Sequence, residues 1–140
     1  MGRILAVDYG QKRTGLAVTD PLKIIANPLE TVRTHDLFTY LESYIKSNEV
    51  ESIVVGEPKR MSGEASAIEV QISAFCKRFE KKFPTITVFR HDESYTSIMA
   101  QQSMIEMGLK KKERQNKAMI DTIAATLILQ SYMQTIHNTI

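Results

Sequence analysis

Apolar and polar positions near the start of the chain follow the pattern of short β-strands. Residues 3–9 and 14–19 are rich in apolar and β-branched side chains, and a polar turn separates them. A third strand is predicted over residues 24–32, although Pro28 lies inside it and proline is tolerated in a sheet only at an edge or a bulge. Together these runs predict a three-stranded meander.

The rest of the chain alternates between helical and strand patterns. Apolar residues recur with the period of an amphipathic helix, and short apolar runs separate the helical segments. Helices are predicted over about residues 35–47, 65–83, 97–107 and 115–135, and strands over residues 52–56 and 86–89. A meander followed by alternating helices and strands indicates an α/β fold with a mixed five-stranded sheet. The later strands are expected to run parallel to the first, with helices on both faces.

Composition narrows the class of protein only modestly. The 140 residues are 43% hydrophobic and 24% charged, which is typical of a soluble globular protein, and the length suits a single domain over residues 1–140. The net charge of +2 is too small to require a polyanionic partner. The one cysteine, Cys76, lies on an apolar helical stripe and is expected in the core. Neither a signal peptide nor a membrane span is predicted, so we expect a cytoplasmic protein.

Asp8 is the most informative residue for function. It ends the apolar run of the first predicted strand and precedes Tyr9-Gly10 and a basic turn that contains Lys12 and Arg13. A carboxylate at the tip of a buried strand is costly without a charged partner, so it often marks a site that binds a cation. The alternative is an aspartate that only makes hydrogen bonds within the turn.

Further acids are expected at the same edge of the sheet. Glu57 and Asp92-Glu93 follow predicted strands, and ligands of α/β sheets gather where strands end. Asp121 borders the apolar stripe of the last predicted helix, so its carboxylate should face that edge. Neighbouring acids repel unless a divalent cation neutralises them, and Mg²⁺ binds one or two carboxylates while retaining sites for water and phosphate oxygens. The alternatives are a solvated carboxylate for Glu57 and an acid paired with the helix dipole or Lys117 for Asp121.

Four segments of the chain together resemble the YqgF (RuvX) family. They are Ile4 to Gly15, Val54 to Pro58, Asp92 to Ser97 and Asp121 to Gln130, and they occur in the family's order over essentially the whole chain. That family has a ribonuclease H-like fold and is related to Holliday-junction resolvases. It is regarded as a nuclease that trims the 5′ end of pre-16S ribosomal RNA in bacteria. The resemblance implies the same fold and a nuclease activity for this chain.

The resemblance also implies which acids carry the chemistry. Asp8 matches the acid of the family's first strand, Glu93 the acid of its Asp-Glu motif, and Asp121 the acid of its final helix. These three residues are expected to be catalytic and to hold Mg²⁺ or Mn²⁺. The chain departs from the family at Ser94, where an arginine usually follows the Asp-Glu pair, and at Glu57, where leucine is usual. The first departure removes a planar phosphate-binding group from that position.

Basic residues flank the predicted acidic site. They lie in the first hairpin, in the loop after residue 57 and in the segment before the last predicted helix. The predicted nucleic-acid-binding set is Lys12, Arg13, Lys59, Arg60, Lys110, Lys111, Lys112 and Arg114. Positive charge beside an acidic centre suits a nuclease, because it holds the nucleic-acid backbone while the acids hold the metal. The alternative for the run from Lys110 to Arg114 is a solvated linker. Tyr9 and Tyr95 are suited either to stack on bases or to pack at strand ends.

These observations predict a metal-dependent phosphodiester nuclease that acts on structured RNA. The expected substrate is the ribosomal RNA precursor, and ribosomal precursor particles are possible partners. One alternative keeps the chemistry but acts on branched DNA, as junction resolvases do. A second is a non-catalytic nucleic-acid-binding module, which the missing arginine favours. A sugar-kinase-like ATPase is disfavoured, because that fold requires a duplicated domain and this chain carries one copy without a P-loop.

Overall fold

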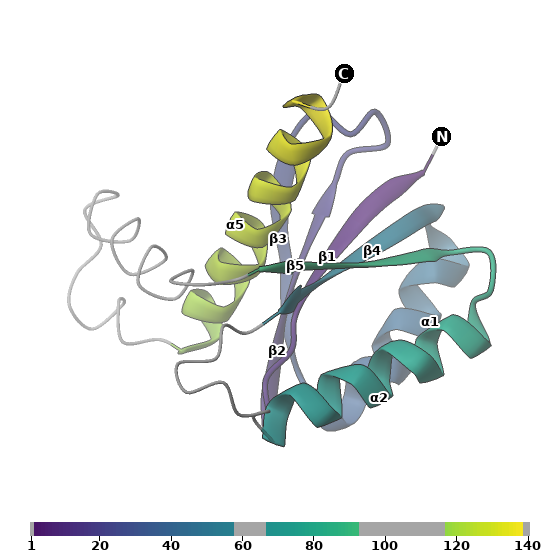
Figure 1. Ribbon diagram of the computed structural model, residues 1–140, viewed down its shortest axis with the longest axis vertical. Helices are drawn as coiled ribbons and strands as arrows, with labels where there is room; N and C mark the ends of the chain where they lie inside the picture. Colours follow the sequence, from purple (N-terminus) through teal and green to yellow (C-terminus); the bar gives the residue numbers. More distant parts are fainter. Residues whose placement is uncertain (1, 58–66, 93–116, 139–140) are drawn as a thin grey trace.

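Five strands form one mixed sheet in the order β3-β2-β1-β4-β5 (Figure 1). The computed structural model describes residues 2–57, 67–92 and 117–138. The strands are β1 (Arg3–Asp8), β2 (Arg13–Thr19), β3 (Ala26–Arg33), β4 (Val50–Glu57) and β5 (Thr87–Asp92). The helices are α1 (Leu37–Ser47), α2 (Ala67–Lys82) and α5 (Lys117–Asn138), and the short 3-10 helix η1 (Thr34–Asp36) precedes α1.

The sheet is a meander extended by two parallel strands. β2 is antiparallel to both β1 and β3, whereas β4 runs parallel to β1 and β5 runs parallel to β4. This topology confirms the predicted mixed sheet. Because β1, β4 and β5 are parallel, their last residues, Asp8, Glu57 and Asp92, share one edge, which we call the carboxyl edge. The start of β2 and the end of β3 lie at the same edge.

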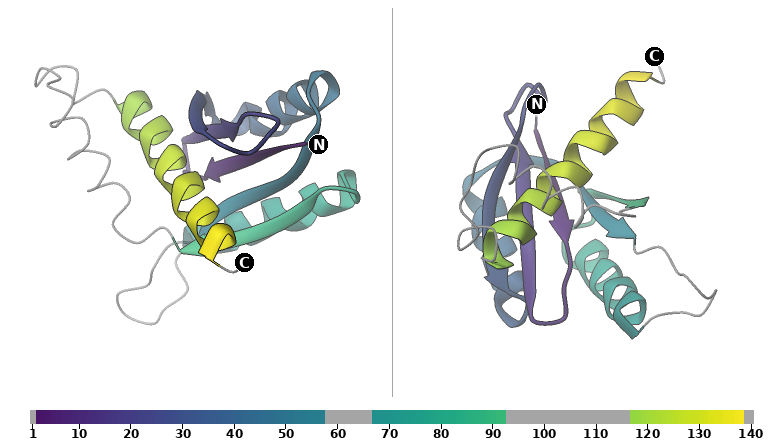
Figure 2. Two further views of the ribbon diagram at one scale, coloured as in Figure 1. Left: turned by 90° about the horizontal axis from the view of Figure 1, so that it is seen from above. Right: turned by 90° about the vertical axis from the view of Figure 1, so that its left-hand side faces the viewer.

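Helices cover both faces of the sheet, with α5 on one side and α1 and α2 on the other (Figure 1). Side chains alternate between the faces, as the strand period requires. In β1, Leu5 and Val7 belong to the core under α1 and α2, whereas Ile4 and Ala6 belong to the core under α5. Figure 2 shows α5 crossing the strands obliquely, and it contacts β1, β2 and β3.

The helices bury the apolar stripes that the sequence predicts. The core side chains are Leu37, Phe38 and Leu41 of α1, Ile72, Phe75, Cys76 and Phe79 of α2, and Ala125, Ile128, Leu129 and Met133 of α5. Each fully buried leucine, isoleucine or phenylalanine contributes about 1.5–3 kcal/mol of transfer free energy. Cys76 is buried as predicted, and burial raises the pKa of its thiol, which disfavours the nucleophilic thiolate and agrees with a packing role.

The structure accommodates Pro28 as the sequence predicts, and it differs from the sequence-based expectation at the ends of β4 and β5. Pro28 lies within β3, which is an edge strand, and pairs with Ala17 next to a shift in register, so the ladder tolerates the missing N–H. β5 continues to Asp92, beyond the predicted end at residue 89, and β4 includes Glu57. The predicted helix over residues 97–107 lies outside the described residues. No helix in the described ranges is long and apolar enough to cross a membrane.

Candidate active site at the carboxyl edge of the sheet

Two of the predicted catalytic acids, Asp8 and Asp121, both lie next to Gly15. Asp8 pairs with Gly15 in the register of β1 and β2. On α5, the backbone of Asp121 packs so closely on Gly15 that a Cβ atom there would collide with the Asp121 carbonyl group. By strand alternation Asp8 shares the face of Ala6, which is the face that α5 covers. The fold therefore brings both acids to one place, as the sequence predicts.

An ion pair joins β2 to the acid on α5. Arg13 Nε donates a hydrogen bond to Asp121 Oδ2 over 3.0 Å, and the two side chains are 40% and 23% exposed. Partial burial makes such a pair stronger than an exposed surface pair, because water screens it less. Asp121 thus faces the sheet and not the solvent, in agreement with its predicted position beside the apolar stripe. Arg13, predicted to bind nucleic acid, neutralises Asp121 in this structure.

The turn between β1 and β2 is held by side-chain and backbone hydrogen bonds from η1. Thr34 donates through its Oγ1 to the carbonyl of Gly10 over 2.6 Å, and through its backbone N–H to the carbonyl of Lys12 over 2.9 Å. A Cβ atom at Gly10 would collide with the carbonyl oxygen of Arg13, so the tightness of the turn requires glycine. These contacts fix the turn while Lys12, which precedes Arg13, stays exposed.

Two further acids end strands at the carboxyl edge but belong to the other face. Glu57 and Asp92 are exposed and pair with each other in the register of β4 and β5. Alternation places Glu57 on the same face as Val55, which belongs to the core under α1 and α2. Glu57 therefore shares an edge with Asp8 but not a face, and this supports its interpretation as a solvated carboxylate.

Arg90 links α2 to the carboxyl edge of the sheet, and the sequence analysis did not identify it as a site residue. Its Nη1 and Nη2 donate to the two carboxylate oxygens of Glu69 on α2, each over 3.0 Å, and Nη2 also donates to the carbonyl of Gly56 over 3.3 Å. Burial alone would lower the pKa of Arg90, but the hydrogen bonds and charge of Glu69 raise it. The bidentate pair ties α2 to the ends of β4 and β5. The sequence did contain a signal for this pair, because an arginine lies on the core-facing side of β5 and a glutamate lies in the preceding helix.

The remaining predicted site residues lie outside the described residues. They are Glu93, Lys59, Arg60, Lys110, Lys111, Lys112 and Arg114. In residues 2–57, 67–92 and 117–138, no group of three or more His, Cys, Asp and Glu side chains is placed to hold a metal ion. The described part of the site therefore consists of Asp8, Asp121, Arg13 and Lys12.

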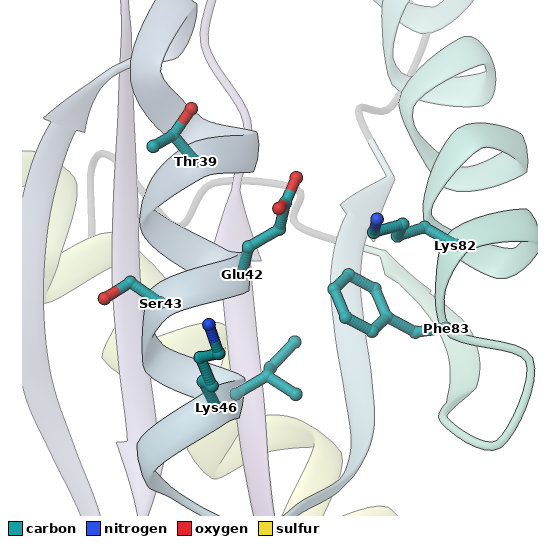
Figure 3. A pocket seen from close by; sticks show the side chains of 7 residues that line it. Thr39, Glu42, Ser43, Lys46, Lys82 and Phe83 are labelled. Carbon is teal, nitrogen blue, oxygen red and sulfur yellow. The ribbon is translucent and has the colours of Figure 1, made fainter.

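A groove between α1 and the end of α2 lies away from this site. It has a volume of about 530 Å³ and is lined by Thr39, Glu42, Ser43, Ile45, Lys46, Lys82 and Phe83. Figure 3 shows Lys82 and Phe83 extending toward the α1 side chains Glu42 and Lys46. Because α1 begins after β3 at the carboxyl edge and runs back along the sheet, its last turns lie toward the opposite edge from Asp8. This groove has no part in the acidic site.

The fold and the position of the acids define a ribonuclease H-like α/β protein, and solved structures agree on the fold. The structure of Thermus thermophilus RuvC in complex with a Holliday junction substrate matches with a TM-score of 0.59 at 14% identity, over 98% of this chain and 97% of that chain. A second structure of the same protein matches with a TM-score of 0.56 at 15% identity, over the same shares of both chains.

Sequence comparisons then establish the family. The model of the RuvX family, described as Holliday junction resolvase, matches residues 2–135, so the chain belongs to the RuvX family. A protein of Christiangramia forsetii named "Putative pre-16S rRNA nuclease" is 56% identical over 133 residues, which are 95% of this chain and 98% of that protein. A protein of Bacteroides fragilis with the same name is 50% identical over 135 residues, 96% of this chain and 98% of that protein. The family resemblance read from the motifs is confirmed.

Proposed function

We propose that this chain is a metal-dependent nuclease that processes the 5′ end of pre-16S ribosomal RNA. One observation carries the proposal: Asp8 and Asp121, distant in sequence, both lie next to Gly15 in a member of the RuvX family. The substrate is taken from the names of the relatives from Christiangramia forsetii and Bacteroides fragilis. On this proposal residues 1–140 act as one nuclease domain in the cytoplasm, on ribosomal precursor particles.

The donor set at the carboxyl edge suits a divalent cation with oxygen ligands. Asp8 and Asp121 provide carboxylate oxygens, and Glu93 follows Asp92 directly in the sequence. Hard cations such as Mg²⁺ and Mn²⁺ prefer such ligands. Asp8, Asp121 and Glu93 would hold the cation, which when bound supplies an activated water and stabilises charge on the leaving oxygen.

The basic residues beside the acids would position the RNA backbone. Arg13 has five N–H donors, and the hydrogen bond to Asp121 uses one of them. A phosphate that approaches Asp121 would therefore meet an arginine already held at that carboxylate. Lys12 adds a positive charge on a turn that Thr34 holds in place, so less conformational entropy is lost when the phosphate binds. Lys59, Arg60, Lys110, Lys111, Lys112 and Arg114 would extend the contact to more distant phosphates.

A second candidate function is resolution of branched DNA. The description of the family model and the fold shared with RuvC favour it. The same acids would serve both substrates, because the chemistry acts on a phosphodiester in each case. The two functions differ in the shape of the nucleic acid that the basic residues must hold.

The proposal is tested by offering both substrates to the protein in parallel. The assay compares a 5′-extended 16S rRNA precursor fragment with a four-way DNA junction, each with Mg²⁺, Mn²⁺ or a chelator. We expect cleavage of the RNA at its 5′ extension with a metal and none with the chelator. Preferential cleavage of the junction would replace the RNA function with the second candidate. Metal-dependent cleavage of neither substrate, with intact binding, would contradict the assignment as a nuclease.

A further inference from the structure

A second groove opens beside the candidate active site, on the other face of the sheet. It has a volume of about 350 Å³, within the usual range for small-molecule sites. Its lining includes Tyr9, Thr34, Phe38, Gln71, Phe75 and Arg78. They come from the end of β1, from η1 with the start of α1, and from α2. Unlike the groove in Figure 3, it lies at the ends of α1 and α2 that adjoin the carboxyl edge.

Aromatic and planar side chains dominate the walls of this groove. The rings of Tyr9 and Phe75 are 5.6 Å apart between centroids, and burial raises the pKa of the Tyr9 hydroxyl above its ordinary value. Arg78 holds its guanidinium 3.9 Å from the centroid of the Phe38 ring. The half-buried Gln71 contributes an amide that can both donate and accept hydrogen bonds. Bases of single-stranded nucleic acid are bound by this combination of side chains: aromatic rings and guanidinium planes stack on them, and amides pair with their edges.

The groove is joined to the catalytic edge through consecutive residues of the chain. Asp8 faces α5, and the next residue, Tyr9, packs against the core under α1 and α2. Their Cα atoms are only about 3.8 Å apart, as in any trans peptide. Thr34 also lines the groove, and its hydroxyl donates to Gly10 in the turn that bears Lys12. A single strand of nucleic acid that lies across the carboxyl edge would thus contact the acids on one face of the sheet and the groove on the other face within a few nucleotides.

We propose that this groove binds one unpaired base of the substrate RNA, next to the phosphodiester that is cleaved. The inference rests on the proposed function and deepens it, because it makes a single-stranded segment beside the cleavage position part of what is recognised. The base stacks on the Tyr9 and Arg78 side of the groove, and Gln71 reads its edge. A fully paired duplex has no base to place there, so the groove favours a single-stranded extension.

The test measures binding and not cleavage, in the presence of a chelator. The probe is the 5′-extended rRNA precursor fragment with an abasic ribose placed at successive positions of the extension. Fluorescence anisotropy gives the dissociation constant for the wild-type protein and for Arg78→Ala, Arg78→Lys and Gln71→Ala. Lys77→Ala is the matched control, since Lys77 is an exposed cation on α2 that does not line the groove.

We expect one abasic position to weaken binding to the wild-type protein by roughly tenfold or more, as the loss of one stacked base does. The same RNA should bind Arg78→Ala and Gln71→Ala with a smaller penalty, because in each variant the base has already lost one of its partners. Arg78→Lys keeps the charge but loses the plane and should behave like Arg78→Ala, whereas Lys77→Ala should show the full wild-type penalty.

The outcomes separate this inference from the proposed function. If no abasic position weakens binding, or if the penalty is the same in the Arg78 and Gln71 variants as in the wild type, the inference is wrong even where the RNA is cleaved with a metal. If one abasic position weakens binding to the wild type and this penalty shrinks in the Arg78 and Gln71 variants, but the RNA is never cleaved, the base-binding groove stands and the nuclease assignment fails.

Discussion

Replacing Gly15 by alanine tests how the two central acids are brought together. The added Cβ atom would overlap the backbone carbonyl of Asp121 and lie 3.0 Å from its Cβ atom. Backbone atoms of a packed helix cannot rotate away as a flexible side chain can. The first turns of α5 must therefore move away from β2, and Asp121 must move relative to Asp8 and Arg13.

The expected cost to stability is moderate, and the expected cost to activity is larger. Overpacking of a well-filled contact costs about 1–3 kcal/mol. For a domain of this size, that lowers the melting temperature by about 4–12 °C. Ordinary carbon contacts lie at about 3.5–4.0 Å, so the helix must shift by on the order of 1 Å. A misplacement of about 1 Å at a catalytic group can lower the rate roughly 100-fold.

Gly2→Ala provides a matched control for this variant. Its added Cβ atom would lie 2.8 Å from the backbone nitrogen of Glu51, so it also strains a close backbone contact, but at the opposite end of β1 from Asp8. The assay combines thermal unfolding with single-turnover cleavage of the 5′-extended RNA, well below both melting temperatures. We expect both variants to lose stability and only Gly15→Ala to lose activity beyond tenfold. Wild-type cleavage by a destabilised Gly15→Ala protein would refute the argument that this contact sets the geometry of the acids.

Three further predictions concern the core, the β2–β3 turn and the basic segment. Leu129→Ala should lower the free energy of unfolding by about 2–5 kcal/mol in urea denaturation, because Leu129 of α5 is fully buried against the sheet, and a loss below about 1 kcal/mol would contradict this. Backbone N–H groups donate to Asp20 and lower its pKa, so its stabilising effect is complete above the unfolded-state value of about 3.9 and is lost as the pH falls through the lower folded pKa. The difference in the free energy of unfolding between wild type and Asp20→Ala should therefore shrink as the pH falls below about 4. A difference that does not change with pH would contradict this role of the Asp20 carboxylate. Replacing Lys110, Lys111 and Lys112 by alanine should weaken RNA binding and reduce its salt slope by about 0.7–0.9 per lost phosphate contact, whereas an unchanged slope would identify the segment as a solvated linker.

Strand and helix patterns were sufficient to predict the architecture of the described residues. The continuous apolar runs in β1 and β4 predicted buried strands, and both strands are buried. The stripe of α5 correctly placed Asp121 beside the sheet, because its apolar neighbours at positions 124, 125 and 128 are buried. The predicted family and ribonuclease H-like fold are confirmed, and the nuclease assignment agrees with the family model and with the names of the relatives.

Pairings between distant residues could not be predicted in the same way. Nothing in the local pattern of Arg13 indicates that its partner is an acid on the last helix, because this contact depends on how α5 crosses β2. The hairpin prediction assigned Arg13 to phosphate binding for that reason. Likewise, Arg90 looks like an ordinary strand-end cation until the parallel pairing of β4 and β5 places it near Gly56 and Glu69. The positions of Glu57 and Asp8 on opposite faces also could not be predicted without the register of the sheet.

The most direct test of the central claim is a double-mutant cycle on Asp8 and Asp121. Single-turnover cleavage of the 5′-extended RNA with Mg²⁺ or Mn²⁺ is measured for Asp8→Asn, Asp121→Asn and the double variant, with Glu57→Gln as the control acid. Residues that act as a unit are strongly non-additive in catalysis. We predict that each single variant keeps the wild-type fold but loses at least about 1,000-fold in rate, that the double variant is little worse, and that Glu57→Gln remains active. If the two single variants each lose little of the cleavage rate and their losses add in the double variant, Asp8 and Asp121 do not form a shared catalytic site.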